Sequence, residues 1–216
     1  MRIYFLFILV LLLSVPVFSQ NNASQSFYSG RTLEAQGRMD EAMFHYNEAV
    51  RISLDEINRN VATDNSYVIL TWTLQRQQRF NEVITWGERG LARNPNNHRL
   101  IEIMGEAYFY LDDYDRSLNL MQRYVSVSPQ GDRVSTAYFF IGEIFRLRRQ
   151  FRHADIAYTT ALQIDPGMPL WWYRLGLVRE SLRDFSFAIE AYERALRINP
   201  TYQEALQGLE RVRRAI

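Results

Sequence analysis

The sequence FAIEAYERALRINP, residues 187–200, repeats the outline of HADIAYTTALQIDP, residues 153–166. Each stretch has two alanines seven positions apart, a tyrosine between them and a closing proline; these are Ala154, Tyr158, Ala161 and Pro166 in one and Ala188, Tyr192, Ala195 and Pro200 in the other. Neither stretch contains residues that could carry out chemistry by themselves. A pattern that returns after 34 residues is typical of an array of small structural units.

The same landmarks define five units, which begin near residues 23, 64, 98, 135 and 169. Apolar residues spaced three and four apart predict two amphipathic helices in each unit. Small residues where two antiparallel helices cross allow a close approach, and aromatic side chains fill the remaining gaps. The small residues expected at these crossings are Gly30, Ala42, Gly105, Gly142, Ala154, Ala161, Gly176, Ala188 and Ala195. Because one hairpin buries only one face, we expect hairpins that stack on their neighbours.

Three segments depart from the regular spacing. The first unit is seven residues longer around LDEINRNVAT, residues 54–63, and seven residues are close to two helical turns, so we expect a longer second helix. Three extra residues near SPQGDRV, residues 128–134, predict a longer turn. Residues 201–216 begin like another unit, but arginines occupy the outward face of the expected helix. This pattern predicts a capping helix, with one face on the last hairpin and the other in solvent.

The fifth unit, WYRLGLVRESLRDFSFAIEAYERALRINP at residues 172–200, resembles the tetratricopeptide repeat (TPR) family. The residues that carry the resemblance are Trp172, Leu175, Gly176, Phe185, Ala188, Tyr192, Ala195 and Pro200. The second unit departs from the family pattern, because Thr71 replaces the glycine and two glycines lie on its second helix. The resemblance implies an all-α, right-handed α-solenoid of about five helix–turn–helix repeats over residues 23–216, closed by the capping helix.

In the TPR family the first helix of each repeat lines a concave groove. Carried over by position, the residues that would line a partner-binding groove here are Tyr28, Arg31, Trp72, Arg76, Glu102, Glu106, Phe109, Tyr110, Phe139, Glu143, Arg146, Tyr173 and Arg174. Aromatic and arginine side chains are enriched in binding surfaces. An alternative stays open for each ring, which could pack between neighbouring helices instead.

One TPR sub-type is not expected. Chaperone-tail binders hold a terminal carboxylate with a clamp of lysine, asparagine and arginine side chains. The matching positions here hold Phe27, Arg31, Ile69, Arg99 and Ile103, which do not reproduce that clamp.

The N-terminus, MRIYFLFILVLLLSVPVFSQ at residues 1–20, has the features of an export signal. Arg2 precedes an apolar run that is too short for a comfortable membrane span, and small residues before Gln20 form a cleavage pattern. We therefore expect a signal peptide at residues 1–19, a short polar leader at residues 20–26, and a protein that is periplasmic or secreted. The alternative is a protein anchored in a membrane through residues 3–18.

The composition argues against several classes of function. The chain has no cysteine, so disulfides, thiolate catalysis and cysteine-ligated zinc are excluded. All 25 basic residues are arginine and the net charge is +1, so no basic footprint for nucleic acid is evident. The three histidines stand far apart in the sequence. Glu102 and Glu106 lie one helical turn apart, and a solvated or arginine-paired helix face explains them better than acid–base work. We expect no metal, no cofactor and no enzymatic activity.

These observations favour an exported TPR scaffold that binds a protein or peptide partner in the cell envelope through a concave groove of aromatic, arginine and glutamate side chains. Two alternatives stay open. One is a small-ligand or transporter-associated binding module of the cell envelope, and the other is a membrane-anchored assembly factor. Proximity to a membrane and formation of a homo-oligomer are compatible with each of the three.

Overall fold

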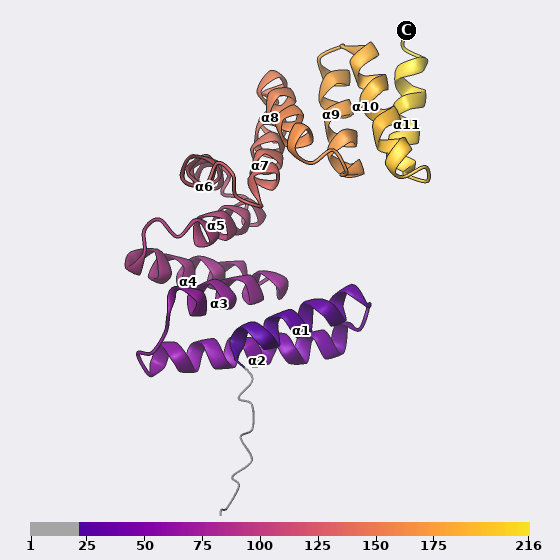
Figure 1. The fold of residues 1–216 in the computed structure, drawn as a ribbon. Helices are drawn as coiled ribbons and strands as arrows, with labels where there is room; N and C mark the ends of the chain where they lie inside the picture. Colours follow the sequence, from indigo (N-terminus) through magenta and orange to yellow (C-terminus); the bar gives the residue numbers. More distant parts are fainter. Residues whose placement is uncertain (1–21) are drawn as a thin grey trace, which may run out of the picture.

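The computed structural model describes residues 22–216, which form eleven helices and no strand (Figure 1). The helices are α1 (Ala23–Ala35), α2 (Met39–Asn58), α3 (Asp64–Arg76), α4 (Phe80–Arg93), α5 (His98–Tyr110), α6 (Tyr114–Val127), α7 (Val134–Leu147), α8 (Phe151–Ile164), α9 (Pro169–Ser181), α10 (Phe185–Ile198) and α11 (Gln203–Arg213). The expected all-α repeat array is confirmed. The predicted signal peptide, residues 1–19, lies outside the described residues.

The helices pack in chain order. Each odd-numbered helix from α1 to α9 is the first helix of a hairpin, and it packs against the even-numbered second helix that follows. Each second helix packs in turn against the next first helix. In Figure 1 the five hairpins follow a curved path from α1 to α10, and α11 closes the far end.

The contacts between hairpins show which helices lie on the inner side of the curve. α1 packs against α3, α3 against α5, and α5 against α7, whereas no two second helices within residues 22–216 pack together to a comparable extent. Since the inner side of a curve is the shorter one, the first helices are the inner helices. We call the surface that α1, α3, α5, α7 and α9 present on this side the inner face.

Within a hairpin, a glycine of the first helix lies directly against a large side chain of the second. A Cβ atom added to Gly142 would lie 2.7 Å from the ring of Tyr158, and one added to Gly176 would lie 2.4 Å from the ring of Tyr192. These distances leave no room for a side chain, so each tyrosine packs against bare backbone. The nine small residues expected at helix crossings are all buried.

The second hairpin distributes its small residues differently. Thr71, which stands in place of the glycine, is buried and donates its hydroxyl hydrogen to carbonyl oxygens of its own helix at 2.9 and 3.1 Å. Gly87 of α4 lies against Met104 of α5, whose sulfur would be 2.4 Å from an added Cβ. The closest approach therefore moves from within the hairpin to its junction with the next one.

The turn inside every hairpin contains one residue with positive φ. These residues are Gly37, Gln78, Asp112, Arg149 and Arg183, with φ between 58° and 75°. They occupy the same position in each unit, so the turn geometry repeats although only the first is glycine. A left-handed backbone is favourable for glycine and costs energy for other residues.

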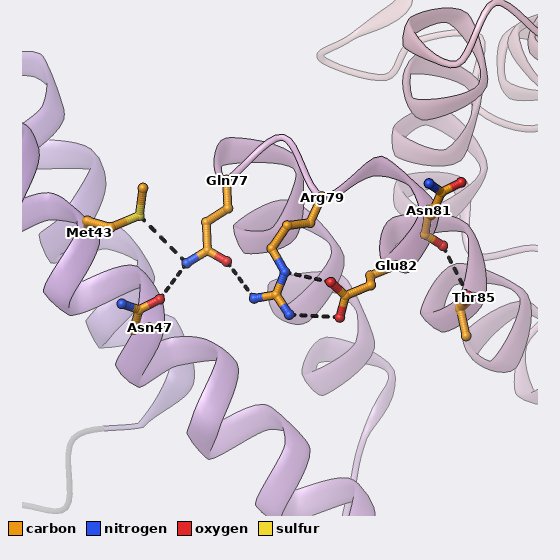
Figure 2. Close-up of polar contacts among 7 residues, drawn as sticks. All are labelled: Met43, Asn47, Gln77, Arg79, Asn81, Glu82 and Thr85. Carbon is orange, nitrogen blue, oxygen red and sulfur yellow. Dashed lines mark hydrogen bonds and ion pairs between the residues drawn. The ribbon is translucent and has the colours of Figure 1, made fainter.

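Polar side chains add to the apolar contacts between hairpins. Figure 2 shows the turn of the second hairpin reaching α2 of the first: the Gln77 amide donates to Asn47 at 2.9 Å. The oxygen of Gln77 accepts from Arg79 at 2.9 Å, and both carboxylate oxygens of Glu82 hold Arg79 at 2.6 and 2.7 Å. The turn is thus fixed to the preceding hairpin.

α1 begins at Ala23, where the first unit was predicted to begin, and it therefore overlaps the predicted polar leader, residues 20–26. Asn22 caps the helix by accepting a hydrogen bond from the backbone N–H of Gln25 at 2.8 Å. Ala23, Ser26 and Phe27 are buried. Residues 23–26 of the predicted leader, 20–26, are therefore part of the helix, because their apolar side packs into the first hairpin.

At the other end, α11 covers the last hairpin. Ala205, Leu209 and Val212 are buried, while the arginines of its last turn are exposed. One face of the helix thus packs on the array and the other is solvated, as a cap requires. Within residues 22–216, no helix is both long and apolar enough to cross a membrane.

Candidate functional site: the inner face of the helical array

All thirteen residues that the sequence assigned to a groove lie on first helices. Tyr28 and Arg31 are on α1, Trp72 and Arg76 on α3, Glu102, Glu106, Phe109 and Tyr110 on α5, Phe139, Glu143 and Arg146 on α7, and Tyr173 and Arg174 on α9. The structure therefore places all of them on the helices that border the inner side of the array. It also divides them into exposed rings, rings packed between hairpins and charges paired within the array.

Two of the predicted rings offer a free face. Tyr28 and Tyr110 are each 52 % exposed. Tyr110 is stacked on Phe80 of α4, with ring centroids 4.9 Å apart and planes 15° from parallel. Partial burial, followed by the charge of Glu106, raises the pKa of Tyr110, so its hydroxyl stays a neutral hydrogen-bond donor. The ring is held in place before any partner arrives.

The other predicted rings pack across the junctions between hairpins. The centroid distances are 5.7 Å for Trp72 and Phe27, 5.0 Å for Phe109 and Phe140, 5.0 Å for Phe139 and Trp171, and 5.4 Å for Tyr173 and Tyr202. Each pair joins one hairpin to the next element of the array. These four rings are partly buried, so they stabilise the junctions as well as bordering the inner face.

Most of the predicted charges form ion pairs across the same junctions. Arg76 lies 3.6 Å from Glu34 of α1, Arg174 lies 3.2 Å from Glu143 of α7, and Arg146 lies 2.7 Å from Glu143. Beyond the predicted set, Arg211 of α11 holds both oxygens of Glu180 of α9 at 2.6 and 2.7 Å. Arg76 and Arg174 thus join neighbouring hairpins through a carboxylate, and Arg146 pairs with Glu143 within α7.

Three of these carboxylates also accept a tyrosine hydroxyl from the second helix of their own hairpin. Tyr46 donates to Glu34 at 2.5 Å, Tyr192 donates to Glu180 at 2.7 Å, and Tyr158 donates to Glu143. Burial and the neighbouring carboxylate raise the pKa of each tyrosine, so the hydroxyls stay protonated. A tyrosine–glutamate–arginine chain therefore links both helices of a hairpin to the next element.

On α5, at the centre of the inner face, two glutamates share a single arginine. Arg133, from the loop between α6 and α7, donates to Glu102 at 2.9 Å and also to Glu106. Both carboxylates are buried, with 3 % and 7 % exposed, and Gln75 of α3 donates to Glu106 at 3.1 Å. Burial, and then the charge of Glu106, raises the pKa of Glu102 well above its ordinary value. The two glutamates are therefore buried and share one arginine, Arg133.

An open cavity of about 510 Å³ lies farther along the inner side. Its lining residues are Arg146, Phe151, Leu177, Glu180, Ser181 and Arg211. The cavity lies between α7 and α9, which are the one pair of successive first helices in residues 22–216 that lack extensive packing. It combines apolar side chains with two arginines that each have a carboxylate nearby.

The part of the chain that the structure describes contains no cluster of three or more histidine or acidic side chains able to hold a metal ion. His45 and His153 instead contact the rings of Phe44 and Phe145, at centroid distances of 5.5 and 5.2 Å.

Four residues that form the ion pairs described above were not among the predicted groove residues: Glu34, Arg133, Glu180 and Arg211. The sequence pattern could have identified Glu34 and Glu180, since each lies four residues after the glycine on the first helix of its unit. Arg133 and Arg211 come from a loop and from the capping helix, where the repeat pattern gives no position to carry over.

Comparison with known proteins identifies the repeats. Residues 169–202 and residues 29–56 each match a family model described as the tetratricopeptide repeat. Human protein O-mannosyl-transferase TMTC3 is 24 % identical over 208 residues, which cover 91 % of this chain and 22 % of TMTC3. The chain spans about a fifth of the length of the curated relatives it matches.

Solved structures with a similar fold also contain helical repeats of this kind. The APC/C hetero-tetramer Cut9–Hcn1 has a chain with a TM-score of 0.74 and 16 % identity, covering 90 % of this chain and 37 % of that one. YrrB, described as a TPR protein with an unusual peptide-binding site, gives a TM-score of 0.59 and 18 % identity, covering 89 % and 94 %. The chain contains TPR repeats and folds as a TPR solenoid, a scaffold type of fold.

Proposed function

We propose that this chain is an exported TPR scaffold that binds a protein or peptide partner in the cell envelope, without enzymatic activity of its own, and that the inner face is its binding surface. The TPR solenoid supports the binding role. Two proteins of similar fold are described by what they assemble with or bind: Cut9–Hcn1 as a hetero-tetramer and YrrB by its peptide-binding site.

The single observation that carries the proposal is the half-exposed tyrosine on the inner helix α5, Tyr110, whose ring is stacked on Phe80. A large ring that is already fixed loses little conformational freedom when a partner covers it. Stacking on Phe80 fixes Tyr110 in this way. Aromatic side chains that keep one free face on an otherwise packed surface are frequent centres of binding energy.

Site-specific photo-cross-linking tests the proposal. A photoreactive amino acid replaces Tyr110 on the inner face, and in a matched protein it replaces Ile156, which is 65 % exposed on the second helix α8. In intact cells we expect position 110 to capture a distinct protein by mass spectrometry, and position 156 to leave that protein uncaptured. Equal capture at both positions, or capture only at 156, would contradict the inner-face assignment.

The export part of the proposal rests on residues 1–19 and is tested separately. The intact mass of the protein purified from its native source is expected to lack residues 1–19, with Gln20 first. A mass that retains them would support the alternative of a membrane-anchored assembly factor held through residues 3–18.

A second candidate is favoured by the cavity between α7 and α9. Its volume, about 510 Å³, and its mixture of Phe151 and Leu177 with arginines fit a small amphipathic ligand. This function would make the protein a small-ligand module of the envelope. It predicts a rise in melting temperature with lipid-like compounds, which a Leu177→Arg variant should lose, together with no protein captured at position 110.

A further inference from the structure

Four side chains from three successive first helices form a continuous row, in which Arg31 and Arg99 are exposed, Trp72 is partly buried and Phe27 is buried. The guanidinium carbon of Arg31 lies 6.0 Å from the ring of Phe27, and that ring lies 5.7 Å from Trp72. The guanidinium carbon of Arg99 also lies 5.8 Å from the Trp72 ring. We call Arg31, Phe27, Trp72 and Arg99 the arginine–aromatic row; it runs from α1 through α3 to the first turn of α5.

The two arginines of the row differ from the others of the inner face. Arg133, Arg146, Arg174 and Arg211 each lie within 3.2 Å of a carboxylate. Arg31 and Arg99 are exposed, and no carboxylate of residues 22–216 lies within 4.0 Å of either. Glu102, three residues after Arg99, pairs with Arg133 instead. Both guanidinium groups therefore keep their full hydrogen-bonding capacity for a ligand.

The charged side chains of the inner face are arranged differently just beyond the row. Arg76 adds a third positive charge beside it, against the single carboxylate of Glu34 at 3.6 Å. In the next turn of α5, Glu102 and Glu106 outnumber Arg133. Within residues 22–216, the first three hairpins thus present unpaired arginines beside a tryptophan, and the row ends where the buried carboxylates of Glu102 and Glu106 pair with Arg133.

We propose that the arginine–aromatic row is the docking site for an acidic segment of the partner; this inference rests on the proposed function. Side-chain carboxylates of the segment accept hydrogen bonds from Arg31 and Arg99, whose planar guanidinium groups suit carboxylates. The exposed part of the Trp72 ring contacts an apolar or aromatic side chain of the same segment. Beyond Arg99 the arginines of the inner face already pair with carboxylates, which limits the segment to the first three hairpins.

Two synthetic probes test this inference. One is a fluorescein-labelled peptide of alternating glutamate and serine with a central phenylalanine, acetylated and amidated at its ends, and the other has arginine in place of every glutamate. By fluorescence anisotropy we expect the acidic peptide to bind at least about tenfold tighter, with an affinity that falls as salt is added. A free C-terminus should change nothing, because side-chain carboxylates make the contacts.

Variants locate the binding on the row. The double change Arg31→Gln and Arg99→Gln should weaken binding of the acidic peptide about tenfold or more, and Arg31→Glu with Arg99→Glu should reverse the preference between the two peptides. The matched control is Arg89→Gln on α4, an exposed arginine whose guanidinium carbon lies 4.6 Å from the ring of Trp86. The control should leave the affinity unchanged.

Three results would overturn the inference: preference for the basic peptide, equal loss in the control, or binding that depends on a free C-terminus. Failure here is distinguishable from failure of the proposed function. If position 110 still captures its partner, and the Arg31→Gln, Arg99→Gln protein captures it equally well, the scaffold function stands and the acidic docking site does not. If nothing is captured and neither peptide binds, both are wrong.

Discussion

The glycine on the first helix of a hairpin is a packing residue because of the tyrosine that faces it from the second helix. The sequence gives the small residue and the aromatic residue at fixed offsets, and the structure puts the two in direct contact at Gly30, Gly142 and Gly176. No flexibility of the glycine is involved, since these positions are ordinary helix. Close packing of the tyrosine ring requires only that the facing residue has no Cβ atom.

We predict that Gly176→Ala destabilises the protein by roughly 1–3 kcal/mol, because the new methyl group would overlap the ring of Tyr192. The matched control is Gly167→Ala in the loop before α9, where the nearest atom to an added Cβ is 3.4 Å away. Urea denaturation followed by circular dichroism measures both. Equal stability of the two variants would show that the crossing is not tight.

The turn residue with positive φ allows a second test of single residues. Gly37→Ala should cost about 1 kcal/mol although no atom lies within 4 Å of the added Cβ, because alanine resists a φ of 75°. Gln78→Gly, at the equivalent turn with φ of 58°, should shift the unfolding midpoint in the opposite direction. Thermal melts of both variants check the signs; a stabilising Gly37→Ala would contradict the turn geometry.

Truncation of the exposed ring should affect binding rather than folding. Tyr110→Ala is expected to weaken binding of the partner captured at that position by about 2 kcal/mol. Trp72→Ala is less informative, since that ring also packs against Phe27 and would cost stability. Phe44→Ala, at a ring that is 70 % exposed on α2, is the control. An unchanged dissociation constant for Tyr110→Ala, measured by titration calorimetry, would remove Tyr110 from the site.

At the scale of helices and loops, the junctions between hairpins are held by a recurring pair of contacts. Each junction has an aromatic pair, and four of the five have a carboxylate–arginine pair. At the fourth junction, Phe139 stacks on Trp171 and Arg174 reaches Glu143. These contacts use residues that a sequence comparison assigns to a groove.

The central and last junctions should respond to pH with opposite signs. Burial raises the pKa of Glu102, so its charged form costs stability above that pKa, and stability is recovered as pH falls through it. Glu102→Gln should therefore be more stable than the native protein at neutral pH, and this advantage should shrink in acid. A stability difference that is independent of pH would contradict this account.

Glu180, at the last junction, has a pKa shifted in the opposite direction from that of Glu102. Its hydrogen bond from Arg211 lowers its pKa, so the pair stabilises the fold above the unfolded-state pKa and the stabilisation is lost as pH falls through the folded-state value. Glu180→Gln should be less stable than the native protein at neutral pH, with a difference that disappears in acid. Denaturation midpoints across the acid range test both variants together.

The lengths of the helices could be predicted from the sequence, whereas the partners of the charges could not. The seven extra residues of the first unit extend α2 to 20 residues, against 14 in α4, and the extra residues near Gly131 lengthen the loop before α7. The spacing of the repeats, together with helical periodicity for α2, predicts both of these lengths. Arg133 reaches Glu102 from that loop, and such a contact depends on the path of an irregular segment, which no repeat pattern specifies.

At the scale of the whole molecule, the fold follows from repetition. Five hairpins with the same offsets bury their faces on one another, and the shorter path between first helices gives the array its curvature (Figure 1). The sequence therefore predicted the TPR solenoid correctly. The groove residues are a weaker prediction, since their position on the inner helices does not say which of them are already occupied by neighbours in the array.

Hydrogen exchange of the purified protein, with and without the partner captured at position 110, tests most directly whether the inner face is the binding surface. We predict that the partner slows exchange in peptides from the first helices α1, α3 and α5, while peptides from the second helices α2, α4 and α6 exchange as in the free protein. Protection confined to the second helices, or to α11 alone, would contradict it.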